Sequence, residues 1–103
     1  MSAEERILTL HPKESKSGVN INRQKYDLMR EAIVETLREE GQLTFQQLRE
    51  VLEGRLEGQF EGSIGWYYTT VKLDLEARGI VKRVGYGSPQ HLQLETQQKE
   101  GSQ

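Results

Sequence analysis

Apolar residues recur along the middle of the chain at the three- and four-residue steps of amphipathic helices. The clearest case runs from about Arg23 to Glu40, where Asn22 is a good N-cap and Gly41 a helix stop. One side of this predicted helix is apolar, through Tyr26, Met29, Ile33 and Leu37. The pattern therefore predicts a first helix that packs one face against a core.

Two shorter helices are expected next. Thr44-Phe45-Gln46-Gln47 matches the capping-box pattern and predicts a second helix as far as about Leu56. A third helix is expected to begin after the N-cap Ser63 and to stop at Gly79. The link before the second helix, at residues 42–44, allows one extended residue pair against a later strand. Phe60, in the turn between the two helices, is expected to fill the core.

The pattern changes to strand character after the third predicted helix. Residues 80–84 and 91–94 are rich in β-formers, and the Gly- and Pro-containing stretch at 85–89 is too long for a two-residue hairpin loop. A hairpin with a projecting tip is therefore predicted. Near the N-terminus, the apolar run at residues 7–10 is interpreted as a strand or a hydrophobic arm, and residues 13–20 as a loop.

These elements predict an α+β fold of three helices with a small antiparallel β-hairpin at the exit of the third helix. The expected organisation is a partly disordered N-terminal arm at residues 1–20, a folded domain at residues 21–94 and a disordered polar tail at residues 95–103. A chain of 103 residues holds one small domain at most, so most of its aliphatic and aromatic residues are expected to be buried.

Composition narrows the function classes. The chain has no cysteine, which excludes disulfides, thiolate catalysis and cysteine-based zinc sites. It has no apolar run of membrane-spanning length and no recognisable signal peptide, so a cytoplasmic protein without membrane contact is expected. The histidines, His11 and His91, have no metal-ligand spacing, and the glycines at 62 and 65 lack the context of a phosphate-binding loop. We expect no enzyme, no metal and no cofactor.

Charge is segregated along the chain. The formal net charge is −2, which argues against strong nonspecific polyanion binding. Lysine and arginine exceed acids by three at residues 11–25 and by two at residues 63–94, whereas acids exceed them by five at residues 26–62. The stretches predicted to form an arm, a third helix and a hairpin are therefore the basic ones.

A helix pair followed by a hairpin suggests a nucleic-acid-binding surface. In a helix-turn-helix, the second helix of the pair presents its N-terminal residues to the major groove. With residues 64, 68, 71 and 75 held inward, the outward positions of the third helix include Leu73 and Glu76 as well as the candidate contact residues. The predicted nucleic-acid-binding residues are Ser63, Gly65, Trp66, Thr69, Thr70 and Lys72 on the helix and Lys82, Arg83 and Tyr86 on the hairpin, where His91 lies beside them.

Other observations favour a different role for the same residues. The third helix lacks an outward Arg, Asn or Gln for bidentate base contacts, and Asp74 and Glu76 would repel phosphates. Gly65 allows either close approach of an anion to the helix N-terminus or close packing against the second helix. Trp66 either forms an apolar patch for a protein partner, with Leu73 and the arm, or packs under the hairpin or the arm, which is the preferred interpretation.

Residues 44–94 resemble the winged helix-turn-helix superfamily. The resemblance is carried by the Ser63-capped helix and by Leu75-Glu76-Ala77-Arg78-Gly79-Ile80-Val81, the passage into the first hairpin strand. The wider string from Ile7-Leu8-Thr9-Leu10-His11-Pro12 through Gly18-Val19-Asn20-Ile21 to Ser63-Ile64-Gly65-Trp66-Tyr67 is similar to a family of small uncharacterised bacterial proteins. The resemblance implies a winged-helix fold and a bacterial origin, and no activity comes with it.

Two functions are expected from these observations. The first is a DNA-binding, transcription-regulator-like winged-helix module whose partner is double-stranded DNA. The alternative is a protein-protein interaction or dimerisation module without nucleic-acid binding. A homodimer is compatible with both, because paired recognition helices read two half-sites through two-fold symmetry.

Overall fold

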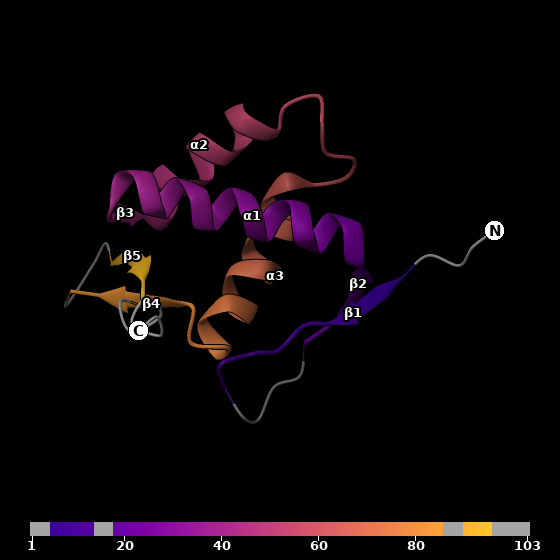
Figure 1. The fold of residues 1–103 in the computed structure, drawn as a ribbon, viewed down its shortest axis with the longest axis horizontal. Coiled ribbons are helices and arrows are strands. Elements are labelled where there is room, and N and C mark those ends of the chain that lie inside the picture. The colour runs from indigo at the N-terminus through magenta and orange to yellow at the C-terminus, as the bar shows by residue number, and fades with distance from the viewer. Residues whose placement is uncertain (1–4, 14–17, 86–89, 96–103) are drawn as a thin grey trace, which may run out of the picture.

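The computed structural model describes residues 5–13, 18–85 and 90–95, which form three helices and five short strands (Figure 1). The helices are α1 (Arg23–Glu40), α2 (Phe45–Leu56) and α3 (Ile64–Ala77). Both α2 and α3 pack against α1, and they also contact each other. In the view of Figure 1, α1 crosses the molecule with α2 above it and α3 below it.

Each helix begins at the residue that the sequence indicates. The Asn22 side chain accepts a hydrogen bond from the Lys25 amide, and Ser63 accepts one from the Trp66 amide. Thr44 and Gln47 form both bonds of the capping box at the start of α2. These bonds satisfy amides that have no partner inside the helix, so the N-terminal predictions are confirmed.

Three strands form a small antiparallel sheet at the exit of α3. They are β3 (Leu43–Thr44), β4 (Val81–Val84) and β5 (His91–Leu94), in the order β3-β5-β4. Leu92 of β5 lies opposite both Leu43 and Arg83. The short link before α2 thus pairs with the hairpin, as predicted. The expected projecting tip, at residues 86–89, lies outside the described residues.

A second antiparallel pair precedes α1. Strand β1 (Arg6–Leu8) pairs with β2 (Asn20–Asn22), with Ile7 opposite Ile21. The strand alternative for the apolar run is confirmed, whereas β2, whose first residue was assigned to a loop, was not expected. The domain boundary expected after residue 20 falls inside this hairpin.

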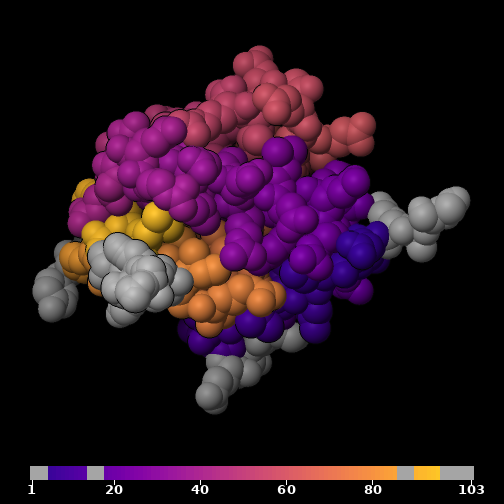
Figure 2. Space-filling model, in the orientation of Figure 1, coloured from indigo at the N-terminus to yellow at the C-terminus, as the bar shows by residue number. Residues whose placement is uncertain are grey.

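The core lies where the three helices meet the two sheets. It is formed by Ile21, Tyr26, Met29, Ile33, Leu37, Leu48, Leu52, Leu56, Tyr68, Val71, Leu75, Val81 and Leu92. Phe60 packs against this cluster, as expected. In the space-filling view, the outer side of α1 covers much of the visible face, and the N-terminal hairpin lies at its right-hand end (Figure 2). The result is an α+β domain, compatible with a winged-helix-like layout.

Candidate functional site

The third helix is the centre of the predicted site, and its four sides have different environments. Ile64, Tyr68, Val71 and Leu75 face the core, as predicted. The opposite, outer side consists of Trp66, Thr69, Thr70, Leu73 and Ala77 by helical spacing. Within α3, all of which is described, no charged residue belongs to this outer side. The two remaining sides carry Lys72 and Glu76 on one flank and Asp74 on the other.

The outer side is only partly solvent-exposed. Trp66 is 47% exposed, Thr69 is exposed, and Thr70, Leu73 and Ala77 are half-buried. The Thr69 hydroxyl donates to the Gly65 carbonyl one turn earlier, at 3.0 Å. This local bond occupies the Thr69 donor, although its oxygen can still accept a hydrogen bond.

Trp66 is not buried, so the preferred interpretation that it packs under the hairpin or the arm is wrong. Its ring meets Tyr67 edge-on at a centroid distance of 4.9 Å. Tyr67 in turn packs edge-on against Phe60 at 5.1 Å, and the Lys25 ammonium lies 5.3 Å from the Tyr67 ring centroid. Tyr67 and Phe60 therefore fill the space next to the core and leave Trp66 outside it.

Gly65 makes room for an arginine of α2. A Cβ at this position would lie 3.1 Å from Nη2 of Arg49. Arg49 is also paired with Glu53 at 3.0 Å and keeps 44% of its side chain exposed. Of the two interpretations of Gly65, close packing against the second helix is the one that the geometry favours. The packing brings a guanidinium to the first turn of α3.

Lys72 and Glu76 do not point outward, which corrects the prediction for both residues. The Lys72 ammonium lies 2.6 Å from Glu76, and these side chains are only 8% and 9% exposed. Lys72 also lies 5.4 Å from the centre of the Phe45 ring, and Arg83 of β4 binds the other Glu76 oxygen at 3.0 Å. Residues 72 and 76 lie one helical turn apart on the flank that faces α2 and β4. Packing against these elements leaves them as a nearly buried ion pair.

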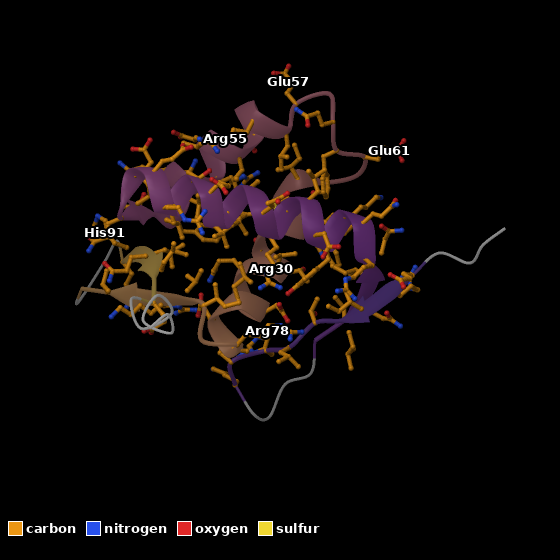
Figure 3. All side chains as sticks on the ribbon, viewed as in Figure 1. Arg30, Arg55, Glu57, Glu61, Arg78 and His91 are labelled. Carbon is orange, nitrogen blue, oxygen red and sulfur yellow. The ribbon has the colours of Figure 1, made fainter. Side chains whose placement is uncertain are left out.

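Asp74, on the opposite flank, is fully buried, and sequence reasoning missed its role. Its carboxylate accepts hydrogen bonds from the Tyr26 hydroxyl, from the Leu10 amide at 2.8 Å and from Arg78 Nε at 2.8 and 2.9 Å. Figure 3 shows Arg78 between the end of α3 and the N-terminal segment. The four-residue spacing of Asp74 and Arg78 was the available signal, but nothing local indicated Leu10 or Tyr26.

This packing raises the pKa of two tyrosine hydroxyls. Burial raises the pKa of Tyr26, and its hydrogen bond to the Asp74 carboxylate raises it further. Burial also raises the pKa of Tyr68, whose hydroxyl donates to the Phe45 carbonyl at 2.9 Å. The hydrogen bond to Asp74 is the main reason that the pKa of Arg78 is raised as well. These shifts keep both tyrosines neutral and Arg78 charged.

The hairpin residues of the predicted site are only partly brought together. Lys82 is half-buried, and Arg83 is exposed but held by Glu76. His91 lies opposite Thr44 and Val84 within the sheet. Tyr86 lies outside the described residues. Of the nine predicted contact residues, Trp66, Thr69 and Thr70 share the outer side of α3, whereas Ser63 caps the helix and Gly65 faces Arg49 of α2.

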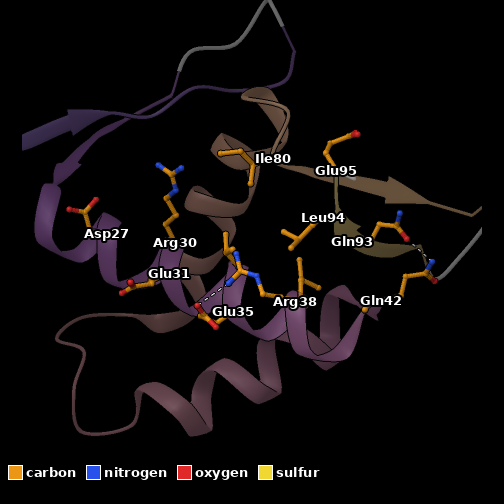
Figure 4. Close-up of a pocket in the computed structure, with 13 residues that line it drawn as sticks. Asp27, Arg30, Glu31, Glu35, Arg38, Gln42, Ile80, Gln93, Leu94 and Glu95 are labelled. Carbon is orange, nitrogen blue, oxygen red and sulfur yellow. Dashed lines mark hydrogen bonds and ion pairs between the residues drawn. The ribbon is translucent and has the colours of Figure 1, made fainter. Parts of the chain in front are cut away.

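An open groove of about 1210 Å³ lies on a different part of the surface, between α1 and the end of β5 (Figure 4). Its apolar lining comes from Val34, Leu37, Ile80 and Leu94. Four carboxylates and two guanidiniums surround it, and Arg38 is paired with Glu35 at 3.0 Å. An excess of carboxylates disfavours polyanions, so this groove is no substitute for the predicted nucleic-acid surface.

Two features are absent from the part of the chain that the structure describes. No three histidine or carboxylate side chains gather closely enough to hold a metal ion. None of the three helices combines the length and the apolar character that a membrane span requires.

Comparison with known proteins places this small domain of three helices and two antiparallel sheets in a family. A family model described as a family of unknown function, DUF6958, matches residues 6–92. The chain belongs to this family. No curated protein and no solved structure matches it.

Proposed function

We propose that this chain is a winged-helix-like docking module that forms a homodimer through the outer side of α3. The winged-helix interpretation is supported by the order of elements. The α2–α3 pair leads directly into the β4–β5 hairpin, and β3, between α1 and α2, completes the sheet against β5. On the outer side of α3 this arrangement leaves Trp66 and Thr69 exposed and Thr70, Leu73 and Ala77 half-buried.

The observation that carries the proposal is the uncharged outer side of α3. Charged residues make up 29% of the chain, yet the exposed side of this helix presents only Trp66, Thr69, Thr70, Leu73 and Ala77. The cores of protein interfaces are depleted in charge and enriched in aromatic residues, and tryptophan is a frequent energetic anchor. An uncharged side can also pack against its own copy without like-charge repulsion, as two-fold symmetry requires.

The DNA-binding alternative has weaker support. With Lys72 buried against Glu76, the outer side of α3 offers no cation to phosphates or bases. One observation favours nucleic acid: the Arg49 guanidinium beside Gly65, at the positive end of the α3 dipole. We therefore keep phosphate-backbone binding through Arg49, Lys82 and Arg83 as a second proposal, with no sequence-specific readout.

Sedimentation and fluorescence test the first proposal. Trp66 is the only tryptophan, so its emission reports on the outer side of α3 without a label. We expect a concentration-dependent dimer and a blue shift of the emission as the dimer forms. Trp66→Ser should give a monomer, whereas the matched change Val19→Ser, at an apolar residue 40% exposed on the N-terminal hairpin, should leave the dimer intact. A strict monomer at millimolar concentration, with solvent-exposed emission throughout, would overturn the proposal.

Titration with duplex DNA tests the second proposal. If Arg49 and Lys82 contact phosphates, the affinity should fall by about 0.9 log unit per log unit of salt for each contact, and Arg49→Gln should reduce that slope by about one contact. Arg55→Gln is the control, because Arg55 lies on the same helix and, like Arg49 with Glu53, is paired with a glutamate, Glu39 of α1. Absence of any chemical-shift change at low salt rules out this proposal and leaves the first untouched.

A further inference from the structure

Strand β1 has an open edge. The amides of Thr9 and Arg23 donate to the carbonyls of Val19 and Glu5, at 2.8 Å each, so residues 5 and 9 direct their backbone groups toward β2. In an antiparallel pair these groups alternate, and the N–H and C=O of Leu8 therefore point away from β2. The described part of the chain places no other strand beside β1.

The side chains along this edge are apolar and exposed. Leu8, the last residue of β1, is 60% exposed, and Leu10, two residues beyond the strand, is 42% exposed. Unpaired edge strands with exposed apolar residues are sites at which proteins add a further strand.

The edge is held in a fixed position. The Thr9 hydroxyl accepts from the Val19 amide at 2.9 Å and donates to the Val19 carbonyl at 3.1 Å. A Cβ on Gly18 would lie 1.9 Å from the Thr9 carbonyl oxygen, so only glycine fits at position 18, beside Thr9. Farther along, the Leu10 amide is bound by Asp74 of α3, so the open part of the edge lies at Leu8 and ends before residue 10. A rigid edge lowers the ordering cost of binding an extended segment.

The charge around the edge selects the partner. Among the described residues from 5 to 25, Arg6, Lys13, Arg23 and Lys25 outnumber the single acid Glu5, and of these cations Arg23 pairs with Asp27 of α1. A second copy of β1 would bring the same cations face to face, whereas an acidic segment would be attracted to them.

We propose that the β1 edge binds an extended acidic segment of another protein as an added strand. The Leu8 N–H donates to the segment and the Leu8 C=O accepts from it, apolar side chains of the segment cover Leu8, and its acidic side chains lie near Arg6. This surface is separate from the outer side of α3, so it does not depend on the homodimer.

A blocked peptide of alternating valine and aspartate, labelled with fluorescein, is the probe. We expect saturable binding by anisotropy, with chemical-shift changes centred on the Leu8 amide. The same peptide with lysine for aspartate, or with N-methylated alternate amides, should bind at least about tenfold more weakly. Equal binding of either control peptide overturns the proposal.

Variants of Leu8 separate backbone from side-chain contributions. Leu8→Pro removes the outward N–H and leaves the bonds to β2, because proline is tolerated where an edge amide faces solvent. It should abolish binding, whereas Leu8→Ala, which keeps the N–H, should weaken it by a smaller factor. Wild-type affinity for Leu8→Pro contradicts the proposal, as does pairing of β1 with a second copy in place of the peptide. If Leu8→Pro does not fold, the N-methylated peptide on the wild-type chain makes the same test.

Discussion

The carboxylates on the two flanks of α3 are bound by different kinds of partner. Both bury a carboxylate, Asp74 on one side and Glu76 on the other. Asp74 is bound by a hydroxyl, a backbone amide and a guanidinium from three parts of the chain. Glu76 is bound by two cations, and one of them, on Arg83, remains 47% exposed.

The difference shows which flank is fixed and which is adjustable. Every partner of Asp74 loses its hydrogen bond if the carboxylate is removed, and the Tyr26 hydroxyl is then left buried without an acceptor. Arg83, by contrast, can turn to water if Glu76 is lost. The free energy of unfolding falls more when a buried polar group loses its hydrogen-bond partner than when an exposed group does, because the exposed group can bind water instead. We therefore expect the stability of the fold to be more sensitive to loss of the carboxylate on the Asp74 flank than to loss of the one on the Glu76 flank.

Removal of the buried carboxylate should have the largest effect. Asp74→Ala is expected to lower the free energy of unfolding by about 2–4 kcal/mol, since it leaves the buried Tyr26 hydroxyl and the part-buried Leu10 amide without an acceptor and removes the ion pair of Arg78, which is 33% exposed. Urea denaturation measures this change. Asp27→Ala, which removes an aspartate 58% exposed in its pair with Arg23, is the control and should cost about 0–1 kcal/mol. Equal costs for the two variants would refute the comparison.

Removal of the other carboxylate should cost less. Glu76→Gln keeps the size and polarity of the side chain and removes the charge that holds Lys72 and Arg83. We expect a loss of about 1–3 kcal/mol, since only the Lys72 ammonium stays buried and it retains the Phe45 ring. The same urea experiment checks the ranking. A cost above that of Asp74→Ala would reverse the assignment of fixed and adjustable flanks.

Alkaline pH should also weaken the fold. Tyr26 and Tyr68 have pKa values raised above the ordinary value of about 10, so above that pH the unfolded chain loses its phenolic protons first. Stability is then full below about pH 10 and falls as the pH rises further, by up to about 1.4 kcal/mol per pH unit for each tyrosine. Urea midpoints between pH 9 and 11.5 test this. Tyr26→Phe and Tyr68→Phe should each reduce the slope, and an unchanged slope in both would exclude the tyrosines as its source.

The smallest effect is expected at Gly65. Alanine there removes the entropic cost of a helical glycine but requires the Arg49 guanidinium to move by a few tenths of an ångström. Because that guanidinium is the end of a flexible, partly exposed side chain, we expect a gain of up to about 1 kcal/mol. Thermal unfolding checks the sign. Destabilisation would mean that the glycine is required to hold Arg49 in place.

The helices could be predicted because their signals are local. The caps at Asn22, Thr44 and Ser63 and the apolar spacing along α1 depend on neighbours within four residues. The hairpin at β4–β5 was likewise found from its own residues. In contrast, β2 has only three residues, and its pairing with β1 depends on Thr9, Val19 and Gly18 meeting in space. No short-range pattern encodes that meeting.

The candidate site was predicted less well, for a related reason. Helical spacing located the outer side of α3 but could not tell which residues on its edges are covered. Helical spacing placed Lys72 and Glu76 among the outward positions, whereas Phe45 of α2 and Arg83 of β4 contact them and both side chains are nearly buried. Trp66 was listed among the outward contact residues, with packing under the hairpin or the arm as the preferred interpretation, whereas its ring meets Tyr67 and Trp66 remains 47% exposed. Whether any of these residues binds DNA or protein stays a prediction.

The hydrogen bond between Leu10 and Asp74 joins residues 64 positions apart, and it has a consequence for synthesis on the ribosome. The strand emerges first and the carboxylate that anchors it much later, since domains fold as units once their long-range partners are available. The N-terminal hairpin therefore leaves the ribosome without its anchor, with Leu8 and Leu10 open to other chains. Only after α3 has emerged can the hairpin reach its final position, so β1 is made before α3 but is fixed only once α3 has been made.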